Sequence, residues 1–223
     1  MTQITEHLRD IVERVARAAR HAPQPTNVTI VAVSKQKSSV EIDEAFRAGQ
    51  RDFGESYVQE AMPKIAALRD REITWHFIGA LQANKTRLVA ENFHWVHTVD
   101  RAKIATRLSE QRPHFAAPLN VLIEVNQAHE AQKSGVTERD VVALARAIVA
   151  LPRLTLRGLM TIPPADGDPV PFFRKLAALQ EHLRNQGLAL DTLSMGMSAD
   201  FETAIAAGSN CVRIGTAIFG SRA

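Results

Sequence analysis

The chain has 223 residues, of which 45% are hydrophobic and 23% charged, so it is long enough for one sizeable core and too apolar to be disordered. The net charge is +3, and the lysines and arginines are scattered without a basic run, so we expect no nucleic-acid partner. A single cysteine, Cys211, excludes an intramolecular disulfide and is expected to be buried and inert. With no signal-peptide pattern and no apolar stretch of about 18 residues, we expect a cytoplasmic protein without a membrane partner.

The first predicted element is an amphipathic helix over residues 3–21, because apolar residues such as Leu8 and Ile11 recur at helical spacing. Pro23 and Pro25 are expected to end this helix. Short apolar strands then alternate strictly with helical stretches. We predict strands at residues 29–35, 51–55, 74–79, 93–99, 119–125, 156–161, 190–195 and 212–214.

This alternation predicts an α/β fold, a single-domain (β/α)8 TIM barrel over residues 1–223 with an extra N-terminal helix. A doubly wound open sheet also alternates strands and helices and is the competing fold. In a barrel, the carboxyl ends of all strands converge on one face, where such folds build their sites. Polar residues at the strand ends are therefore the candidates for function.

Lys35 is the most conspicuous of these residues because it ends an almost continuous run of β-branched residues. A lysine is costly to bury. At the carboxyl end of a buried strand it is badly placed for stability and well placed for chemistry. Taken alone, the stretch is also compatible with a lysine that has left the strand and reached solvent.

The last two predicted strands indicate a phosphate site. Gly215 allows close approach of the backbone, and Thr216 offers a hydroxyl and a backbone N–H. The residues after Thr216 can begin a short helix whose amino end favours an anion. Ser198 follows the seventh strand and can donate to the same phosphate. A helix cap at Ser198 and a tight turn at Gly215 are the structural alternatives.

Arg213 lies inside an apolar strand, so its guanidinium group needs an acceptor within reach. A structural salt bridge would satisfy it, and so would a ring nitrogen of a bound heterocycle. A lysine, a phosphate site and a polar group facing a pyridine nitrogen together form the pyridoxal 5′-phosphate (PLP) arrangement. In that arrangement the amine of Lys35 forms a Schiff base with the aldehyde.

Other titratable residues carry weaker cases. His76 is expected to be a buried, hydrogen-bonded histidine in the third strand. His94 and His97 face opposite sides of a strand, so we predict no metal pair there. Asp52 and Glu55 are candidate acids by position alone.

Five motifs occur in order along nearly the whole chain. They lie at residues 31–35 (Val-Ala-Val-Ser-Lys), 50–55 (Gln-Arg-Asp-Phe-Gly-Glu), 75–79 (Trp-His-Phe-Ile-Gly), 159–163 (Leu-Met-Thr-Ile-Pro) and 193–201 (Leu-Ser-Met-Gly-Met-Ser-Ala-Asp-Phe), the last continuing into 212–220. Together they closely resemble the YggS-like pyridoxal phosphate homeostasis proteins, whose barrel is similar to the N-terminal domain of alanine racemase.

The resemblance implies a fold type III PLP barrel with PLP on Lys35, phosphate contacts from the last two strands and Arg213 near the pyridine nitrogen. An arginine at that position would disfavour protonation of the ring and weaken its electron sink. No catalytic residue is predicted. The residues that we assign to cofactor binding are Lys35, Ser56, Met197, Ser198, Arg213, Gly215 and Thr216.

Two residues depart from the family pattern. The family usually has asparagine where this chain has Ser56, and that asparagine approaches the cofactor. Serine is shorter and has no amide, so this contact is affected. The family also often has histidine where this chain has Ala80, which removes a polar group from the third loop. Neither change touches the lysine or the phosphate site.

The function expected from these features is PLP binding and intracellular PLP homeostasis or carriage, with little or no catalysis. The alternative is a PLP-dependent amino-acid racemase, and the third possibility is a barrel without cofactor that acts as an interaction module. Related racemases add a β-rich domain, which we do not expect here because the sequence ends three residues after Gly220, and the sequence does not identify an acid–base partner for Lys35 on the far face of the substrate carbon. Expected partners are PLP, amino acids and PLP-dependent apo-enzymes, and the expected state is a monomer.

Overall fold

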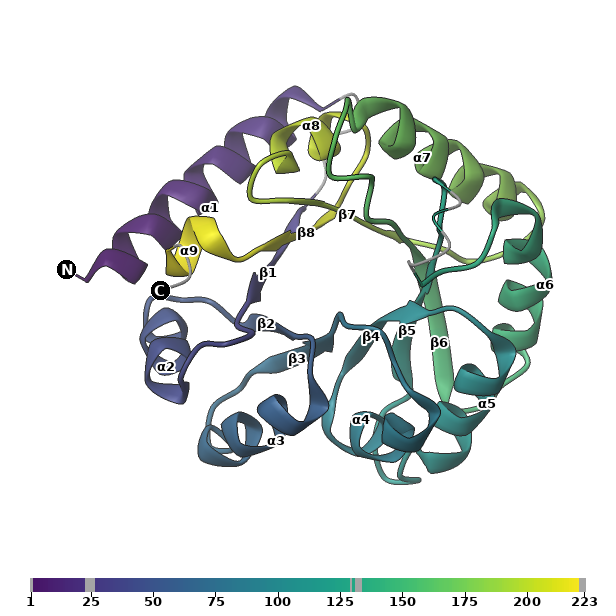
Figure 1. Ribbon diagram of the computed structural model, residues 1–223, viewed down its shortest axis with the longest axis horizontal. Coiled ribbons are helices and arrows are strands. Elements are labelled where there is room, and N and C mark those ends of the chain that lie inside the picture. Colours follow the sequence, from purple (N-terminus) through teal and green to yellow (C-terminus); the bar gives the residue numbers. More distant parts are fainter. Residues whose placement is uncertain (1, 23–26, 129, 131–133, 221–223) are drawn as a thin grey trace.

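The structure is a computed structural model that describes residues 2–22, 27–128, 130 and 134–220. Parallel strands pair in chain order, and the last pairs with the first, so the sheet is a closed barrel (Figure 1). The strands are β1 (Thr29–Val33), β2 (Asp52–Glu55), β3 (Thr74–Phe77), β4 (Trp95–Val99), β5 (Leu119–Glu124), β6 (Leu154–Met160), β7 (Thr192–Met197) and β8 (Cys211–Ile214). The predicted TIM barrel is confirmed, and the open sheet is excluded.

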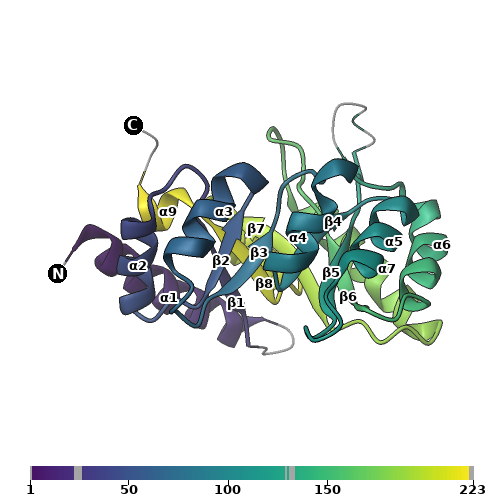
Figure 2. The ribbon, with the colours of Figure 1, turned by 90° about the horizontal axis from the view of Figure 1, so that it is seen from below.

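The helices lie on the outside of the barrel (Figures 1 and 2). They are α1 (Gln3–His21), α2 (Ser39–Arg47), α3 (Val58–Ala67), the 3₁₀ turn η1 (Ala83–Lys85), α4 (Thr86–Asn92), α5 (Ala102–Gln111), α6 (Glu138–Val149), α7 (Val170–Asn185), α8 (Phe201–Ala206) and α9 (Thr216–Phe219). The extra N-terminal helix α1 buries Leu8, Ile11 and Val15 and packs along α8, α9 and α2. Pro23 and Pro25, which we expected to end α1, lie outside the described residues.

The strands are buried on both faces, which explains why they appear in the sequence as nearly continuous apolar runs. One face packs against the helices, with Phe53, Phe77 and Phe173 among the largest fully buried side chains. The loops that follow the strands gather on one side of the molecule, the upper side in Figure 2. This carboxyl-end face is the mouth of the barrel, and it holds Lys35.

Every strand differs from its expected range by one or two residues at one end or both, and β1 ends at Val33, so Lys35 lies after the strand and not in it. β6 begins at Leu154, two residues earlier than predicted, and β7 continues to Met197. Met197 is therefore a strand residue that pairs with Arg213 of β8, and it does not lie in the loop. The assignment of one domain to residues 1–223 stays a prediction. Over the described ranges, no helix combines the length and apolarity needed to cross a bilayer.

Candidate functional site

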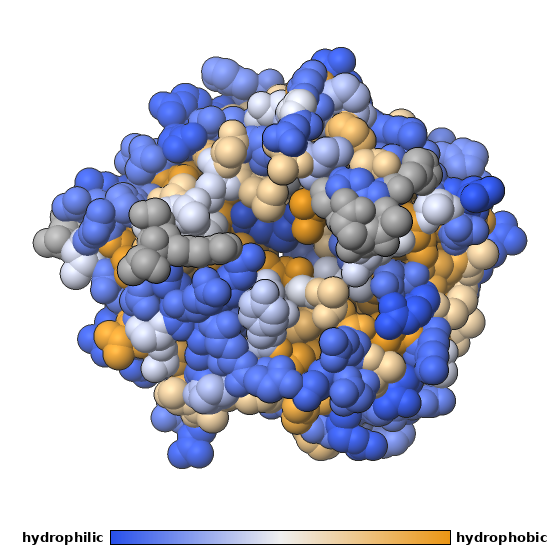
Figure 3. Space-filling view, in the orientation of Figure 1, coloured by the Kyte–Doolittle hydropathy of each residue, from blue (hydrophilic) through white to orange (hydrophobic). Residues whose placement is uncertain are grey.

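The mouth of the barrel is hollowed at its centre, with hydrophilic side chains in the recess (Figure 3). Lys35 follows β1 in a turn and is partly buried. It lines a cavity of about 410 Å³, so it does not simply project into open solvent. The other residues of this cavity are Ser56, Tyr57, Val58, Gln59, Phe77, Gly79, Ala80, Leu81, Gln82 and Lys85. Both departures from the family pattern, Ser56 and Ala80, thus lie beside Lys35.

The loop that carries Ser56 is tightly fixed against the third loop. A Cβ atom added to Gly79 would lie 2.1 Å from the carbonyl oxygen of Ser56. Only glycine therefore allows the two backbones to approach this closely. Thr98 of β4 donates its hydroxyl to the carbonyl of Gly79 at 2.6 Å, which holds the third loop in place. The position of residue 56 relative to Lys35 is consequently well defined.

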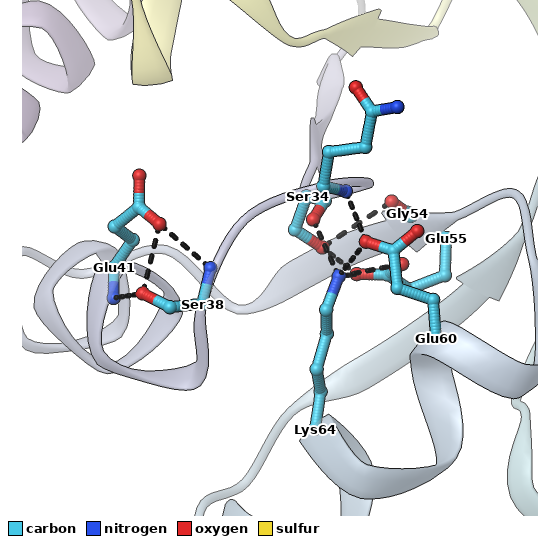
Figure 4. A network of polar contacts seen from close by, with 8 residues as sticks. Ser34, Ser38, Glu41, Gly54, Glu55, Glu60 and Lys64 are labelled. Atoms are coloured by element: carbon cyan, nitrogen blue, oxygen red, sulfur yellow. Dashed lines mark hydrogen bonds and ion pairs between the residues drawn. The ribbon is translucent and has the colours of Figure 1, made fainter. Parts of the chain in front are cut away.

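The backbone on both sides of Lys35 is held by a buried ion network (Figure 4). Lys64 of α3 donates to the carbonyl of Ser34 at 2.9 Å and to the carboxylates of Glu55 at 2.9 Å and Glu60 at 2.6 Å. The carboxylate of Glu60 also accepts the N–H of Gln36. Gln36 has a left-handed backbone, with φ of +62°, so the chain turns sharply directly after Lys35.

Glu55 is the centre of this network. Its side chain is fully buried, and it accepts the hydroxyl of Ser34 at 2.6 Å as well as the ammonium of Lys64. Burial raises the pKa of Glu55, while the bonds from Ser34 and Lys64 act in the opposite direction. We infer that Glu55, a candidate acid in the sequence, holds in place the Lys35 loop, which is the segment of residues 34–38 between β1 and α2. Lys64 was missed because a lysine on a helix is ordinarily solvated.

The end of the Lys35 loop is fixed by the start of α2 (Figure 4). The hydroxyl of Ser38 accepts the N–H of Glu41 at 3.2 Å, and the carboxylate of Glu41 accepts the N–H of Ser38 at 2.7 Å. This reciprocal capping box satisfies two N–H groups that the helix itself cannot bond. Lys37 then donates to the carbonyl of Phe219 at 3.1 Å, which ties the loop to α9.

The proposed phosphate donors converge at the ends of β7 and β8. The hydroxyl of Ser198 accepts the backbone N–H groups of Gly215 and Ala217, both at 3.3 Å. Ser198 does not cap α8, because Asp200 occupies the N-cap position of that helix. Thr216 is exposed as the first residue of α9. Two backbone N–H groups thus converge on the hydroxyl of Ser198, and oriented backbone N–H groups of this kind are what an anion site uses.

This group of donors lies next to the Lys35 loop, because β8 pairs with β1. A Cβ atom added to Gly215 would lie 3.4 Å from the Cβ of Val33, two residues before Lys35. Met197 is partly exposed at the end of β7 and donates its N–H to Asp200 at 2.6 Å. The structure therefore brings the predicted residues of β1, β7 and β8 to one side of the mouth.

Arg213 is buried, with 4% of its surface exposed. Its two terminal nitrogens donate to the hydroxyl of Ser194 at 2.6 Å and to the carbonyl of Thr161 at 2.9 Å. Both acceptors are uncharged, so these contacts are hydrogen bonds and not the structural salt bridge considered above. Thr161 follows β6, which places the guanidinium group at the mouth. Burial lowers the pKa of Arg213, although an arginine stays charged.

Glu124 is a residue that the sequence reasoning missed. It ends β5 with 8% of its surface exposed, and its Oε2 atom has no hydrogen-bond partner. Burial raises its pKa to about 7, the charge of Asp100 adds to this shift, and the charge of Arg213 opposes it. Glu124 lines a second cavity of about 230 Å³, which shares Ala80 with the Lys35 cavity. The sequence signal that could have identified Glu124 is its position, a glutamate at the end of an otherwise apolar strand.

The histidines lie as expected. His76 is a buried histidine with hydrogen-bond partners on both ring nitrogens. His94 accepts the N–H of Trp75, whereas His97 points to His76, so they do not form a pair. Among the described residues, no three His, Cys, Asp or Glu side chains could hold a metal ion together. Burial raises the pKa of Cys211 to about 11, in keeping with an inert thiol.

Residues 7–223 match the family described as "Alanine racemase, N-terminal domain". The chain belongs to this family. It is 51% identical to the pyridoxal phosphate homeostasis protein of Pseudomonas aeruginosa, over 100% of this chain and 97% of the relative. It is 49% identical to the protein of that name from Escherichia coli K12, over 100% of this chain and 98% of the relative. The resemblance found in the five motifs is thereby confirmed.

Solved structures agree with this assignment. The structure of PipY from Synechococcus elongatus with PLP bound is 34% identical, with a TM-score of 0.85, and the match covers 97% of this chain and all of that one. Alanine racemase from Corynebacterium glutamicum has 20% identity and a TM-score of 0.68, covering 99% of this chain and 61% of that one. The racemase likeness shows the shared barrel alone.

Proposed function

We propose that this protein binds PLP on Lys35 and serves in PLP homeostasis or carriage, with little or no catalysis. One observation carries the proposal: the Lys35 side chain lines a cavity at the mouth of an alanine-racemase-type barrel. The names of the relatives from Pseudomonas aeruginosa and Escherichia coli support the same role. The amino-acid racemase that we considered as the alternative has no such support from these full-length relatives.

The groups at the mouth fit each part of PLP. When bound, PLP supplies an aldehyde that condenses with an amine, a phosphate and a pyridine ring able to withdraw electrons. Lys35 offers the amine. Ser198 offers a hydroxyl for the phosphate, and the backbone N–H groups of Gly215 and Ala217, which converge on that hydroxyl, lie beside it. Thr216, exposed at the start of α9, adds a hydroxyl.

Arg213 is proposed to face the ring nitrogen. A guanidinium group carries five N–H donors, and the bonds to Ser194 and Thr161 use two of them. Because arginine donates and cannot accept, it keeps a facing ring nitrogen unprotonated. An unprotonated ring is a poor electron sink, which suits a carrier better than a racemase. We place Ser56 and Met197 at the edges of the same site.

The finer parts of the proposal concern partners and setting. The protein would exchange PLP with PLP-dependent apo-enzymes, and amino acids would reach the PLP through the open mouth. We also propose that it acts as a monomer in the cytoplasm. The single cysteine, which is buried, is compatible with a reducing compartment.

A transfer assay tests the proposed carriage. The PLP-loaded protein is freed of unbound PLP and mixed with the apo-form of a PLP-dependent enzyme, and the recovered enzyme activity is followed over time. We expect activity to rise faster than with the same amount of PLP loaded on serum albumin. Recovery no faster than from albumin would contradict carriage.

A second assay separates carriage from racemisation. The loaded protein is incubated with a panel of amino acids in deuterium oxide, and exchange at the α-carbon is measured by NMR. We expect no steady exchange above that of free PLP, because a ring nitrogen that faces Arg213 stays unprotonated and the ring is then a poor electron sink. Sustained turnover that depends on Lys35 would overturn the carrier assignment in favour of an enzyme.

A further inference from the structure

Five side chains form a continuous hydrogen-bonded chain through the interior of the barrel. Arg213 of β8 bonds Ser194 of β7 at 2.6 Å, and the hydroxyl of Ser194 lies 2.9 Å from Nδ1 of His97 in β4. Nε2 of His97 lies 2.9 Å from Nδ1 of His76 in β3. Nε2 of His76 lies 2.9 Å from Oδ1 of Asp52 in β2. The chain thus crosses from one side of the barrel to the other.

The two ends of this chain lie on opposite faces of the molecule. Arg213 bonds Thr161 at the carboxyl end of β6, which belongs to the mouth. Asp52 is the first residue of β2 and lines a cavity of about 250 Å³ with other first residues of strands, including Thr29 and Trp95. The carboxylate end therefore lies at the amino-terminal face, with its side chain about 30% exposed.

The direction of every bond in the chain follows from its two ends. Arginine can only donate, so the hydroxyl of Ser194 accepts from Arg213, and its own proton is free to be donated to Nδ1 of a neutral His97. His97 then carries its proton on Nε2 and donates to Nδ1 of His76. His76 in turn carries its proton on Nε2 and donates to Asp52, whose carboxylate can only accept. The same tautomers result when the assignment starts from Asp52.

The interior of the barrel favours this neutral arrangement of the two rings. His76, His97 and Ser194 each have 1% or less of their surface exposed. Burial lowers the pKa of His76 and lowers that of His97 well below its usual value. The ring of His76 also stacks on Trp95, at 5.6 Å between centroids and 11° between planes. With rigid rings and one fixed tautomer each, no member can turn without breaking a buried bond.

We propose that Asp52, His76, His97 and Ser194 form a positioning relay that orients the Arg213 guanidinium group toward the cofactor ring. The relay rests on the proposed PLP function. Its consequence is that a carboxylate at the amino-terminal face helps set the position of the group at the mouth that faces the pyridine nitrogen. The four residues are positioning residues, since they act through Arg213.

The relay is tested with variants at its two ends and a matched control for each. Ser194→Ala removes the link next to Arg213, and Asp52→Ala removes the acceptor at the far end. Ser209→Ala removes another buried hydroxyl, which bonds only backbone carbonyls. Asp191→Ala removes another carboxylate of the Asp52 cavity, which pairs with Arg157. Circular dichroism and urea unfolding confirm that each variant is folded.

Two readouts are taken from the PLP-loaded proteins: the PLP dissociation constant and the absorption spectrum of bound PLP. We expect Ser194→Ala to raise the dissociation constant about 3- to 10-fold, since it removes one bond to a charged group, and to shift the spectrum. Asp52→Ala is expected to act in the same direction, about 2- to 5-fold. Asp52→Asn should rescue both readouts, because the amide oxygen still accepts from His76.

The double variant Asp52→Ala/Ser194→Ala provides the sharpest outcome. If both residues act through one chain, the double variant binds PLP no worse than Ser194→Ala alone. The relay would be overturned if the fold-increases in the dissociation constant of the two single variants multiply in the double variant. It would also be overturned if Asp52→Ala matches Asp191→Ala in affinity and spectrum; both outcomes would leave PLP binding intact. A wild-type protein that takes up no PLP would overturn the proposed function and, with it, the role of the relay.

The tautomers are tested independently of PLP. In the apo-protein, ¹⁵N–¹H correlation spectra of the histidine rings report which nitrogen carries the proton. We expect the Nε2–H tautomer for both His76 and His97 in the wild type. A Nδ1–H tautomer at either ring would show that the chain runs in another direction and would refute the relay.

Discussion

Two buried glutamates at the mouth of the barrel, Glu55 at the end of β2 and Glu124 at the end of β5, have opposite surroundings. Both are largely desolvated, and burial raises the pKa of each. Glu55 accepts bonds from the ammonium of Lys64 and the hydroxyl of Ser34. Glu124 has an Oε2 atom without a hydrogen-bond partner, beside a cavity.

The difference shows how one fold uses the same side chain in two ways. At β2 the carboxylate is charged and paired, and it fixes the loop that carries Lys35. At β5 burial favours the neutral carboxyl group at the edge of the site, and its Oε2 atom has no hydrogen-bond partner to offset the loss of water. Removing the partner of a paired buried charge lowers the stability of the fold. An unpaired buried group lowers stability whenever it ionises.

Breaking the pair at β2 should have the largest effect. Lys64→Met leaves Glu55 buried without its counter-charge, and we expect a loss of about 4 kcal/mol in the free energy of unfolding at pH 8. The loss should be smaller at pH 5, because Glu55 can then take up a proton. Urea unfolding followed by circular dichroism measures both values. Lys175→Met, which breaks the exposed pair with Glu138, is the control and should cost less than about 1 kcal/mol. Equal losses in the two variants would contradict the bracing role.

Removing the unpaired charge at β5 should stabilise the protein in a pH-dependent manner. The pKa of Glu124 is raised from 4.5 to about 7, so the folded state binds more protons than the unfolded state between these values. Stability is therefore lost as the pH rises through this window, by about 3 kcal/mol in total. Glu124→Gln should be more stable than the wild type by about that amount at pH 8 and about equal to it at pH 4.

The control for this prediction is Glu181→Gln, whose carboxylate is 61% exposed on α7. It should change stability little at either pH. The account of Glu124 is wrong if the gain in the Glu124→Gln variant is the same at pH 4 and pH 8, since a uniform gain would have a cause other than ionisation.

The smallest effect is expected at residue 56, in the loop that follows the paired glutamate. Ser56→Asn introduces the residue that the family resemblance implies at this position, and Ser56 lines the same cavity as Lys35. We expect PLP affinity to stay equal or to rise by up to about 10-fold, the value of one good hydrogen bond. Fluorescence titration with PLP measures it. A large loss of affinity would mean that residue 56 does not lie at the edge of the site.

Most of the fold follows from local patterns in the sequence. The β-branched runs, such as the one before Lys35, predict buried parallel strands, and their strict alternation with helices predicts the barrel. Strand ends do not follow from local patterns, because only the pairing of Met197 with Arg213 extends β7 beyond Met195. The proximity of Ser198 and Gly215 could be predicted, because the two residues follow neighbouring strands of the barrel.

The buried polar contacts could not be predicted, since they join residues that are far apart in the chain. His97 and Ser194 are 97 positions apart, and only closure of the barrel brings them within hydrogen-bond distance. Lys64 resembles any solvated lysine of an amphipathic helix until α3 packs on β2. Asp52 is a candidate acid by position alone in the sequence, which does not reveal its bond to His76 of the neighbouring strand.

The central claim is that Lys35 is the amine that binds PLP. The Lys35 cavity contains a second lysine, Lys85, which provides a matched control. Wild-type protein, Lys35→Ala and Lys85→Ala are each incubated with PLP, reduced with borohydride and analysed by peptide mass spectrometry together with the absorption spectrum before reduction. We predict a pyridoxyl group on Lys35 in the wild type and in Lys85→Ala, with loss of both the group and the absorption band in Lys35→Ala. A band and adduct that persist without Lys35, or a wild-type protein that takes up no PLP, would contradict the account.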